Sequence, residues 1–134
     1  MQNSIMDKDI KVPIFIESRY KLNRKKVENI VTATLKKHGI KGPVEVSVAI
    51  VGNRKMRGLN KKYRNLDKTS NVLSFSQMEG SISVMPQDML VLGDVVVCYP
   101  VAILEAAREE MLVDDKICEL VEHGILHLLG IHHE

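Results

Sequence analysis

Aromatic residues are scarce in this chain of 134 residues, which has three Tyr, two Phe and no Trp, or 4% in all. Many proteins that bind single-stranded nucleic acids stack bases on several aromatic side chains, and this composition argues against such a platform. No apolar run approaches the ~20 residues that a membrane helix needs. The first nine residues are polar and contain no apolar segment of the kind found in secretory signals. We therefore expect no membrane partner and no secretion.

Cysteine is also rare, and its two copies, Cys98 and Cys118, each lie inside an apolar segment. This excludes a disulfide scaffold and makes a reducing cytoplasm the simplest location. The apolar fraction of 45% and the charged fraction of 27% are ordinary for a soluble globular protein, which excludes a disordered chain. The length fits one domain spanning residues 1–134.

The net charge of +2 conceals a strong asymmetry along the chain. Residues 1–75 hold 17 Lys and Arg against 6 Asp and Glu, whereas residues 76–134 hold 2 against 11. The densest group of bases consists of Arg54, Lys55, Arg57, Lys61 and Lys62, followed by Arg64 and Lys68. Such a surface attracts phosphates, although a solvated helix face without a partner explains the charges equally well.

Alternating apolar residues and turn residues predict four strands, over residues 11–17, 44–51, 69–76 and 89–99. The first strand contains Pro13, which favours an edge of the sheet. The last is mostly apolar, so we expect it to be buried on both faces. Together with the helices, these strands predict an α+β fold, a single domain with a small mixed four-stranded sheet.

Four helices are predicted from apolar spacing and from residues that begin or end helices. Asn23 is predicted to cap a helix that runs to His38, Asn53 to cap one that carries the basic group, and Asp114 to cap one that runs to Leu129. The remaining helix is predicted from Pro100 to about Met111. In the second helix Met56, Leu59 and Tyr63 form the inner stripe, which places most of the bases on the outer side.

Four of the five histidines lie at the end of the last predicted helix. His123 and His127 are four residues apart, so their rings share one face at a spacing that suits two ligands of one metal ion. Gly130 permits the left-handed backbone that ends the helix, and His132 or His133 could then reach the same ion. Three imidazoles and a water form an open, catalytic type of site, for which zinc is the first choice, although nickel, copper and iron also accept imidazole.

The alternative is a buried helix with incidental histidines, but imidazoles among apolar neighbours need partners, which favours the metal ion. The spacing HxxxHxxGxxH also occurs in metzincin proteases, which carry a general-base Glu directly after the first His. This chain has Gly124 at that position, and Glu122 lies on the other side of His123. A peptidase built on this motif would lack its base.

Four sequence blocks carry a resemblance to a known family. They are LNKKYR at residues 59–64, SNVLSFS at 70–76, LGD at 92–94 and HGILHLLGIHH at 123–133. In this order they resemble LNxxYR, TDVLSFP, LGD and HGxLHLxGxDH of the YbeY family, metal-dependent single-strand-specific endoribonucleases. The resemblance extends from about residue 44 to the end, and it implies a zincin-like metal site at the end of the last helix.

The resemblance implies that His123, His127 and His133 bind one divalent metal ion, most simply zinc. It also implies that Arg64 is the catalytic arginine, and a guanidinium suits a phosphodiester. Without the resemblance, Arg64 would be one more solvated base. Single-stranded or ribosomal RNA would then be the substrate, in ribosomal RNA maturation and quality control on the small ribosomal subunit. The bases that we expect to follow the RNA backbone are Arg54, Lys55, Arg57, Lys61 and Lys62.

Three residues depart from the family pattern. His132 replaces an Asp, where it would carry a proton in catalysis or compete with His133 for the metal ion. Asn71 and Ser76 replace the Asp and Pro of TDVLSFP, which removes a negative charge near the site. These departures keep open a ribosome-associated RNA-binding protein whose metal ion is structural. A metal hydrolase of another substrate, an ester or an amide, is a third reading that Gly124 and the basic face disfavour.

Overall fold

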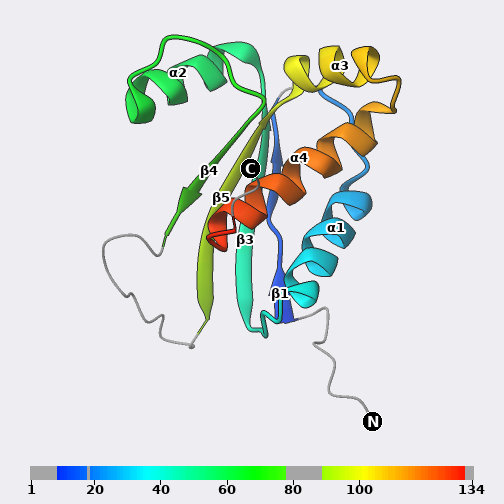
Figure 1. Ribbon diagram of the computed structural model, residues 1–134, viewed down its shortest axis with the longest axis vertical. Coiled ribbons are helices and arrows are strands. Elements are labelled where there is room, and N and C mark those ends of the chain that lie inside the picture. The colour runs from blue at the N-terminus through cyan, green and yellow to red at the C-terminus, as the bar shows by residue number, and fades with distance from the viewer. Residues whose placement is uncertain (1–8, 18, 78–88, 132–134) are drawn as a thin grey trace.

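The structure is a computed structural model that describes residues 9–17, 19–77 and 89–131 (Figure 1). The elements are β1 (Ile10–Lys11), β2 (Ile14–Ile16), α1 (Arg24–Lys37), β3 (Val44–Val51), α2 (Asn53–Arg64), β4 (Val72–Ser76), β5 (Leu90–Cys98), α3 (Tyr99–Arg108) and α4 (Val113–Leu128). The predicted α+β class is confirmed. The last two strands are shorter than predicted: β4 begins three residues later, and β5 is one residue shorter at each end. Helix α3 ends three residues before the predicted Met111.

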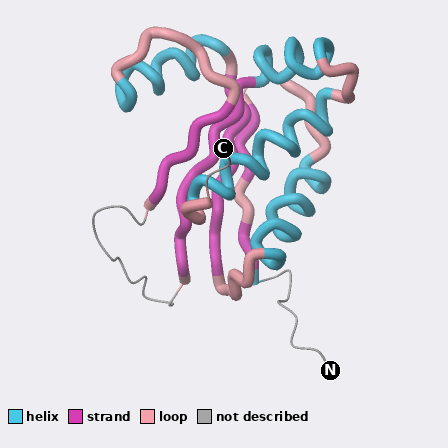
Figure 2. Tube along the Cα trace, in the orientation of Figure 1, coloured by secondary structure: helices cyan, strands magenta, loops and turns pink. Residues whose placement is uncertain are grey.

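The strands form one mixed sheet in the order β1–β3–β5–β4, and β2 also pairs with β3 (Figure 2). β1, β2 and β5 run parallel to β3, whereas β4 runs antiparallel to β5. The sheet has five strands, and not the four predicted, because the strand expected over residues 11–17 is interrupted at Pro13. Pro13 has no N–H for the ladder, but its carbonyl accepts a hydrogen bond of 2.9 Å from the Val48 amide.

The sheet separates two hydrophobic clusters. On one face, α1 and α4 cover the sheet, and the alternate residues of β3 point into this main core (Figure 1). Its fully buried members include Val27, Val31, Leu35, Val44, Val46, Val48, Ile50, Ile117, Val121 and Ile125. On the other face, α2 covers a smaller cluster that contains Met56, Leu73 and Val96. Within the described residues, no helix covers the rest of this second face, and a pocket lies there.

Two predicted N-caps are wrong. Asn53 is the first residue of α2 and Gly52 is its N-cap; the Asn53 carboxamide oxygen instead accepts a hydrogen bond of 3.2 Å from the Cys98 thiol. α4 begins at Val113, which packs against the main core, and Asp114 therefore lies in the first turn. A negative charge there still interacts favourably with the helix dipole.

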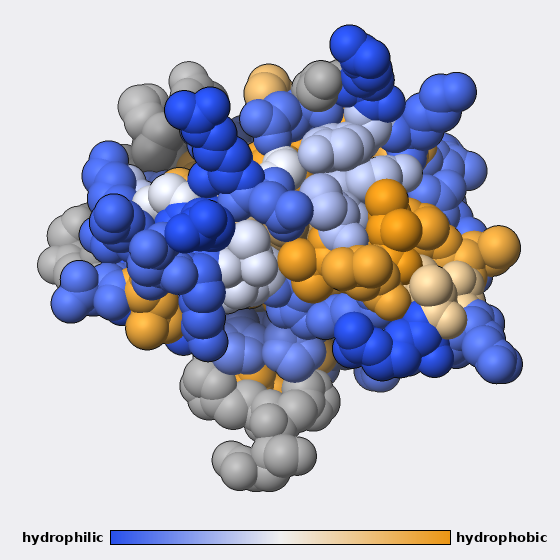
Figure 3. Space-filling view, turned by 90° about the horizontal axis from the view of Figure 1, so that it is seen from above, coloured by the Kyte–Doolittle hydropathy of each residue, from blue (hydrophilic) through white to orange (hydrophobic). Residues whose placement is uncertain are grey.

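The surface differs in character over α2 and α3. Hydrophilic residues dominate the surface over α2, whereas an apolar patch lies over α3, where Ile103 and Leu104 are exposed (Figure 3). Among the described ranges, no helix has both the length and the apolar character needed to span a bilayer.

Candidate active site

A pocket of about 510 Å³ lies between the end of α2, strand β4 and helix α4. Arg64, the last residue of α2, lines it together with His123 and His127 of α4. The structure therefore brings the predicted arginine into the same pocket as two of the three predicted metal ligands. The remaining wall consists of Tyr63, Asn71, Val72, Leu73, Ser74, Phe75 and Gly124.

The two histidines form a pair on one side of α4. Their ring centroids are 5.0 Å apart and the ring planes differ by 25°. Both residues are exposed, whereas their neighbours Ile125 and Leu126 are buried. Two imidazoles one helical turn apart suit Zn²⁺, so this part of the predicted donor set fits the metal ion.

The third predicted ligand, His133, and the neighbouring His132 lie outside the described residues. Within the ranges that the structure describes, no group of three His, Cys, Asp or Glu side chains is arranged to hold a metal ion. The metal site and the role of each histidine therefore stay predictions.

The backbone turns at Gly130, as the sequence predicts. Gly130 has φ of +79°, a conformation that L side chains rarely adopt. Its N–H donates to the His127 carbonyl at 3.0 Å, and the Ile131 N–H donates to the Leu126 carbonyl at 2.8 Å. These two hydrogen bonds form a Schellman motif, which ends the helix at Leu128, directly after the second histidine.

The position of Arg64 depends on a buried amide that the sequence did not single out. The Asn60 side chain is fully buried, and its Nδ2 donates to the Lys68 carbonyl at 2.8 Å and to Ser70 Oγ at 2.9 Å. The backbone carbonyl of Asn60 also accepts a hydrogen bond of 3.1 Å from the backbone N–H of Leu66. Asn60 therefore fixes the loop that follows Arg64 and leads into β4.

A carboxylate from α3 lies beside Asn71. The Asn71 Nδ2 donates to both carboxylate oxygens of Glu105, each at 3.2 Å. The sequence predicts that Asn71 removes a negative charge from this region. The structure shows that Glu105 supplies one next to the same position, although Glu105 is also 3.7 Å from the Lys116 ammonium.

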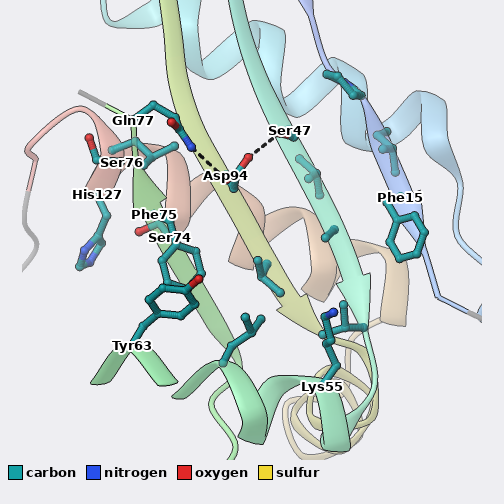
Figure 4. A pocket seen from close by; sticks show the side chains of 18 residues that line it. Phe15, Ser47, Lys55, Tyr63, Ser74, Phe75, Ser76, Gln77, Asp94 and His127 are labelled. Carbon is teal, nitrogen blue, oxygen red and sulfur yellow. Dashed lines mark hydrogen bonds between the residues drawn. The ribbon is translucent and has the colours of Figure 1, made fainter. Parts of the chain in front are cut away.

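A larger pocket of about 950 Å³ adjoins the first, and both are lined by Tyr63, Ser74, Phe75 and His127 (Figure 4). It occupies the open face of the sheet, with Lys55 of α2 at one end. The Asp94 carboxylate accepts hydrogen bonds from Ser47 Oγ at 2.6 Å and from Gln77 Nε2 at 3.5 Å. Asp94 is thus held by Ser47 of β3 and by Gln77, which directly follows β4.

Tyr63 does not lie on the buried stripe predicted for it. Met56 is fully buried and Leu59 is half-buried, but Tyr63 is 57% exposed. The Tyr63 ring packs edge-on against Phe75 of β4, with centroids 5.2 Å apart, because α2 ends at the margin of the sheet. Two of the five aromatic residues thus meet beside Arg64, which composition alone does not reveal.

The five predicted RNA-binding bases are all exposed on α2, but they do not form one row. Lys55 lines the larger pocket, and Lys62 lies near Tyr63, with its ammonium 5.1 Å from the ring centroid. Arg54, Arg57 and Lys61 line a separate hollow on the outer side of α2. Arg57 also forms an ion pair of 2.9 Å with Asp67. Lys55 and Lys62 also line a further pocket with Tyr63, which Arg54 reaches as well.

The comparisons with known proteins decide the family. The family model described as Endoribonuclease YbeY matches residues 12–134. The chain belongs to the YbeY family. This confirms the resemblance of the four sequence blocks.

Curated YbeY relatives agree with this assignment, and a solved structure is similar in fold. The chain is 37% identical over 121 residues to endoribonuclease YbeY of Acinetobacter baumannii, covering 90% of this chain and 76% of that protein. It is 36% identical over 109 residues to the YbeY protein of Roseiflexus castenholzii, covering 81% and 69%. A solution structure of a Thermotoga maritima protein is 28% identical, with a TM-score of 0.58 over 92% of this chain and 75% of that chain.

Proposed function

We propose that this protein is a single-strand-specific endoribonuclease that hydrolyses RNA phosphodiesters with the help of one divalent metal ion, most simply zinc. The observation that carries the proposal is the pocket shared by Arg64, His123 and His127. The names of the YbeY relatives support the endoribonuclease activity. The metal dependence is supported by the donor chemistry of the histidine pair.

The predicted site residues divide the chemistry between them. His123, His127 and His133 would hold the metal ion, which when bound acts as a Lewis acid and lowers the pKa of a water molecule. Arg64 binds the non-bridging oxygens of the phosphate and stabilises the charge that grows on them. We assign the transfer of a proton to His132, whose ordinary pKa suits that role near neutral pH.

The basic side chains of α2 bind the RNA backbone next to the cleaved bond. Lys55 lines the larger pocket, and Lys62 lies beside Tyr63, which lines both pockets. These two lysines are therefore placed to contact the neighbouring phosphates. Phosphate contacts carry no sequence information, so we expect weak specificity for the nucleobase. They also release counterions, so we expect RNA binding to depend strongly on salt.

We further propose that the activity serves the maturation and quality control of ribosomal RNA in the cytoplasm, with the small ribosomal subunit as a partner. Family membership is the support for this role. Cells that lack the protein should accumulate precursors of the small-subunit RNA. Normal RNA ends in such cells would contradict this role without affecting the proposed chemistry.

The experiment that tests the activity is cleavage of an end-labelled single-stranded RNA by the wild-type protein, Arg64→Ala and His127→Ala, with and without a chelator. We expect the chelator to abolish cleavage and Arg64→Ala to reduce it by about 10²–10³-fold. His127→Ala should also lower the zinc content per chain. Arg108→Ala is the matched control, because Arg108 is an exposed arginine at the end of α3 and lines neither pocket. Equal cleavage by all variants would contradict the proposal.

A second candidate is an RNA-binding protein whose metal ion is structural. His132, in place of the Asp of the family motif, favours it. This alternative predicts RNA binding without cleavage and unfolding on chelation. The endoribonuclease predicts instead that the chelated protein stays folded, because the core described above does not depend on the histidines. Circular dichroism with and without chelator separates the two.

A further inference from the structure

We propose that the Tyr63 ring is a stacking platform for one base of a bound single-stranded RNA, in the nucleotide next to the one whose phosphate meets Arg64. The choice of RNA as the ligand rests on the proposed function. The position of the ring rests on the structure alone.

Tyr63 lies where the two pockets join. Its ring lines both the pocket of Arg64 and the histidines and the larger pocket on the open face of the sheet (Figure 4). Tyr63 also precedes Arg64 directly in the chain, at the end of the same helix. A strand of RNA with one phosphate at Arg64 that continues into the larger pocket must therefore pass this ring.

The ring is both supported and accessible. Phe75 contacts it edge-on, at 5.2 Å between centroids and 61° between planes, which restrains the Tyr63 side chain. More than half of Tyr63 is nevertheless exposed, at 57%. A tyrosine that only fills the core buries most of its ring, because the hydrophobic gain depends on the area removed from water. The exposed ring leaves that area available to a ligand.

The surroundings favour a nucleic acid as that ligand. The Lys62 ammonium lies 5.1 Å from the ring centroid, and Lys55 and Arg64 border the two pockets. An aromatic ring with cations over and beside it matches a base flanked by phosphates, which is the usual design of single-strand binding sites. The larger pocket, about 950 Å³, is at the upper end of the range for small-ligand sites and has room for more than the base alone.

Stacking on one ring tolerates any base, because every base has a π-face. The chain therefore needs only one well-placed aromatic residue, and its low aromatic content does not exclude this mode of binding. It does exclude a row of stacked bases, so the effect should be confined to one nucleotide.

The test is a double-mutant cycle between the protein and the RNA. Binding of a short single-stranded RNA is measured by fluorescence anisotropy in chelator, so that no cleavage occurs. The protein is wild type, Tyr63→Leu or Tyr63→Phe, and the RNA carries a single abasic nucleotide moved along the strand. We expect Tyr63→Leu to weaken binding of the intact RNA by about 5- to 150-fold, and Tyr63→Phe to change it little.

The deciding result is the coupling between the two changes. One abasic position should weaken binding to the wild-type protein and to Tyr63→Phe, but have little further effect on Tyr63→Leu. Phe15→Leu is the matched control: Phe15 is an exposed aromatic residue, 63% accessible, at the opposite side of the larger pocket (Figure 4). It should show no coupling to that position. Thermal denaturation verifies that each variant is folded.

The outcomes separate this inference from the proposed function. If wild-type protein cleaves RNA but no abasic position couples to Tyr63, the stacking role is wrong and the endoribonuclease stands. If coupling is present while wild-type protein with zinc cuts nothing, the stacking role stands and the proposed activity fails. Equally weakened binding in Tyr63→Leu and Tyr63→Phe would also overturn stacking, because it would assign the contact to the hydroxyl.

Discussion

Gly124 lies directly against Val95, where α4 crosses β5. A Cβ atom at position 124 would be 2.6 Å from Val95 Cγ1 and 3.1 Å from Cγ2. The helix therefore approaches the sheet at the turn between His123 and His127. The same contact explains why the general-base Glu of a metzincin has no place here, since its side chain would enter the packed core.

Gly124→Ala should destabilise the protein by about 1–3 kcal/mol, the usual cost of overpacking, even though Ala is the better helix former. Val95→Ala removes both γ-carbons, and the remaining contact to Val95 Cβ, at 3.4 Å, is ordinary. We therefore expect Gly124→Ala to be neutral or stabilising in the Val95→Ala background. Urea unfolding of the four proteins in this cycle measures the coupling.

Gly58→Ala is the control for this cycle. Gly58 lies inside α2, and a Cβ there would meet no atom within 4 Å apart from its own helix backbone and its chain neighbours. This substitution should therefore stabilise the protein by up to about 1 kcal/mol through helix propensity. Additive effects of Gly124→Ala and Val95→Ala would contradict the steric explanation.

Local sequence patterns predicted the parts of the fold that depend on neighbouring residues. The alternation of Val44, Val46 and Val48 indicated a strand with one face in the core, and Gly130 indicated the end of the last helix. Both are confirmed. The helical period also predicted that His123 and His127 share a face, as their stacked rings show.

Local sequence patterns did not predict the features that depend on tertiary packing. Tyr63 follows the helical stripe of Met56 and Leu59, but it is exposed because α2 ends at the sheet margin. Asn53 has the side chain of an N-cap, but it is engaged by Cys98 from β5. The proximity of Arg64 to the histidines came only from the family resemblance, since no periodicity connects residues so far apart in the chain.

Asn60→Asp should destabilise the protein by about 2–4 kcal/mol, because it replaces a buried donor by a charged acceptor. The wild-type amide donates to the Lys68 carbonyl and to Ser70 Oγ, and a carboxylate would repel the first. Urea unfolding measures the decrease in stability. Asn65→Asp, at the left-handed C-cap of the same helix, should cost less, about 0.5–1 kcal/mol, because Asp also tolerates this conformation but its charge opposes the helix dipole. Equal effects of the two substitutions would show that Asn60 does not anchor the loop.

Lys116→Met should cost about 1–3 kcal/mol of stability, because it leaves three carboxylates facing one another without their cation. The buried Lys116 ammonium donates to Glu109 and Glu119 at 2.8–3.0 Å, and Glu105 is 3.7 Å away. Burial alone would lower the pKa of Lys116, but the hydrogen bonds and charges of Glu119 and Glu109 outweigh it and raise the pKa above its usual value.

The pH dependence of this effect has a definite sign. A raised pKa in the folded state gives stability that is complete below the unfolded lysine pKa of about 10.4 and is lost as the pH rises through the folded value. The difference in stability between wild type and Lys116→Met should thus be equal at about pH 7 and pH 9 and decrease only in stronger alkali. A difference that already fades between those two pH values would contradict the ion cluster.

Removing one basic side chain beside Tyr63 should change the salt dependence of RNA binding more than removing one on the outer side of α2. A substitution that abolishes binding to one phosphate should reduce the slope of log K against log salt by about 0.7 for a single strand. We expect this reduction for Lys62→Gln, whose ammonium lies beside Tyr63, and a smaller one for Arg57→Gln, because Asp67 already pairs with Arg57. Lys25→Gln, exposed on α1, should leave the slope unchanged. Equal slopes for all three variants would mean that the net charge attracts the RNA without a defined path across α2.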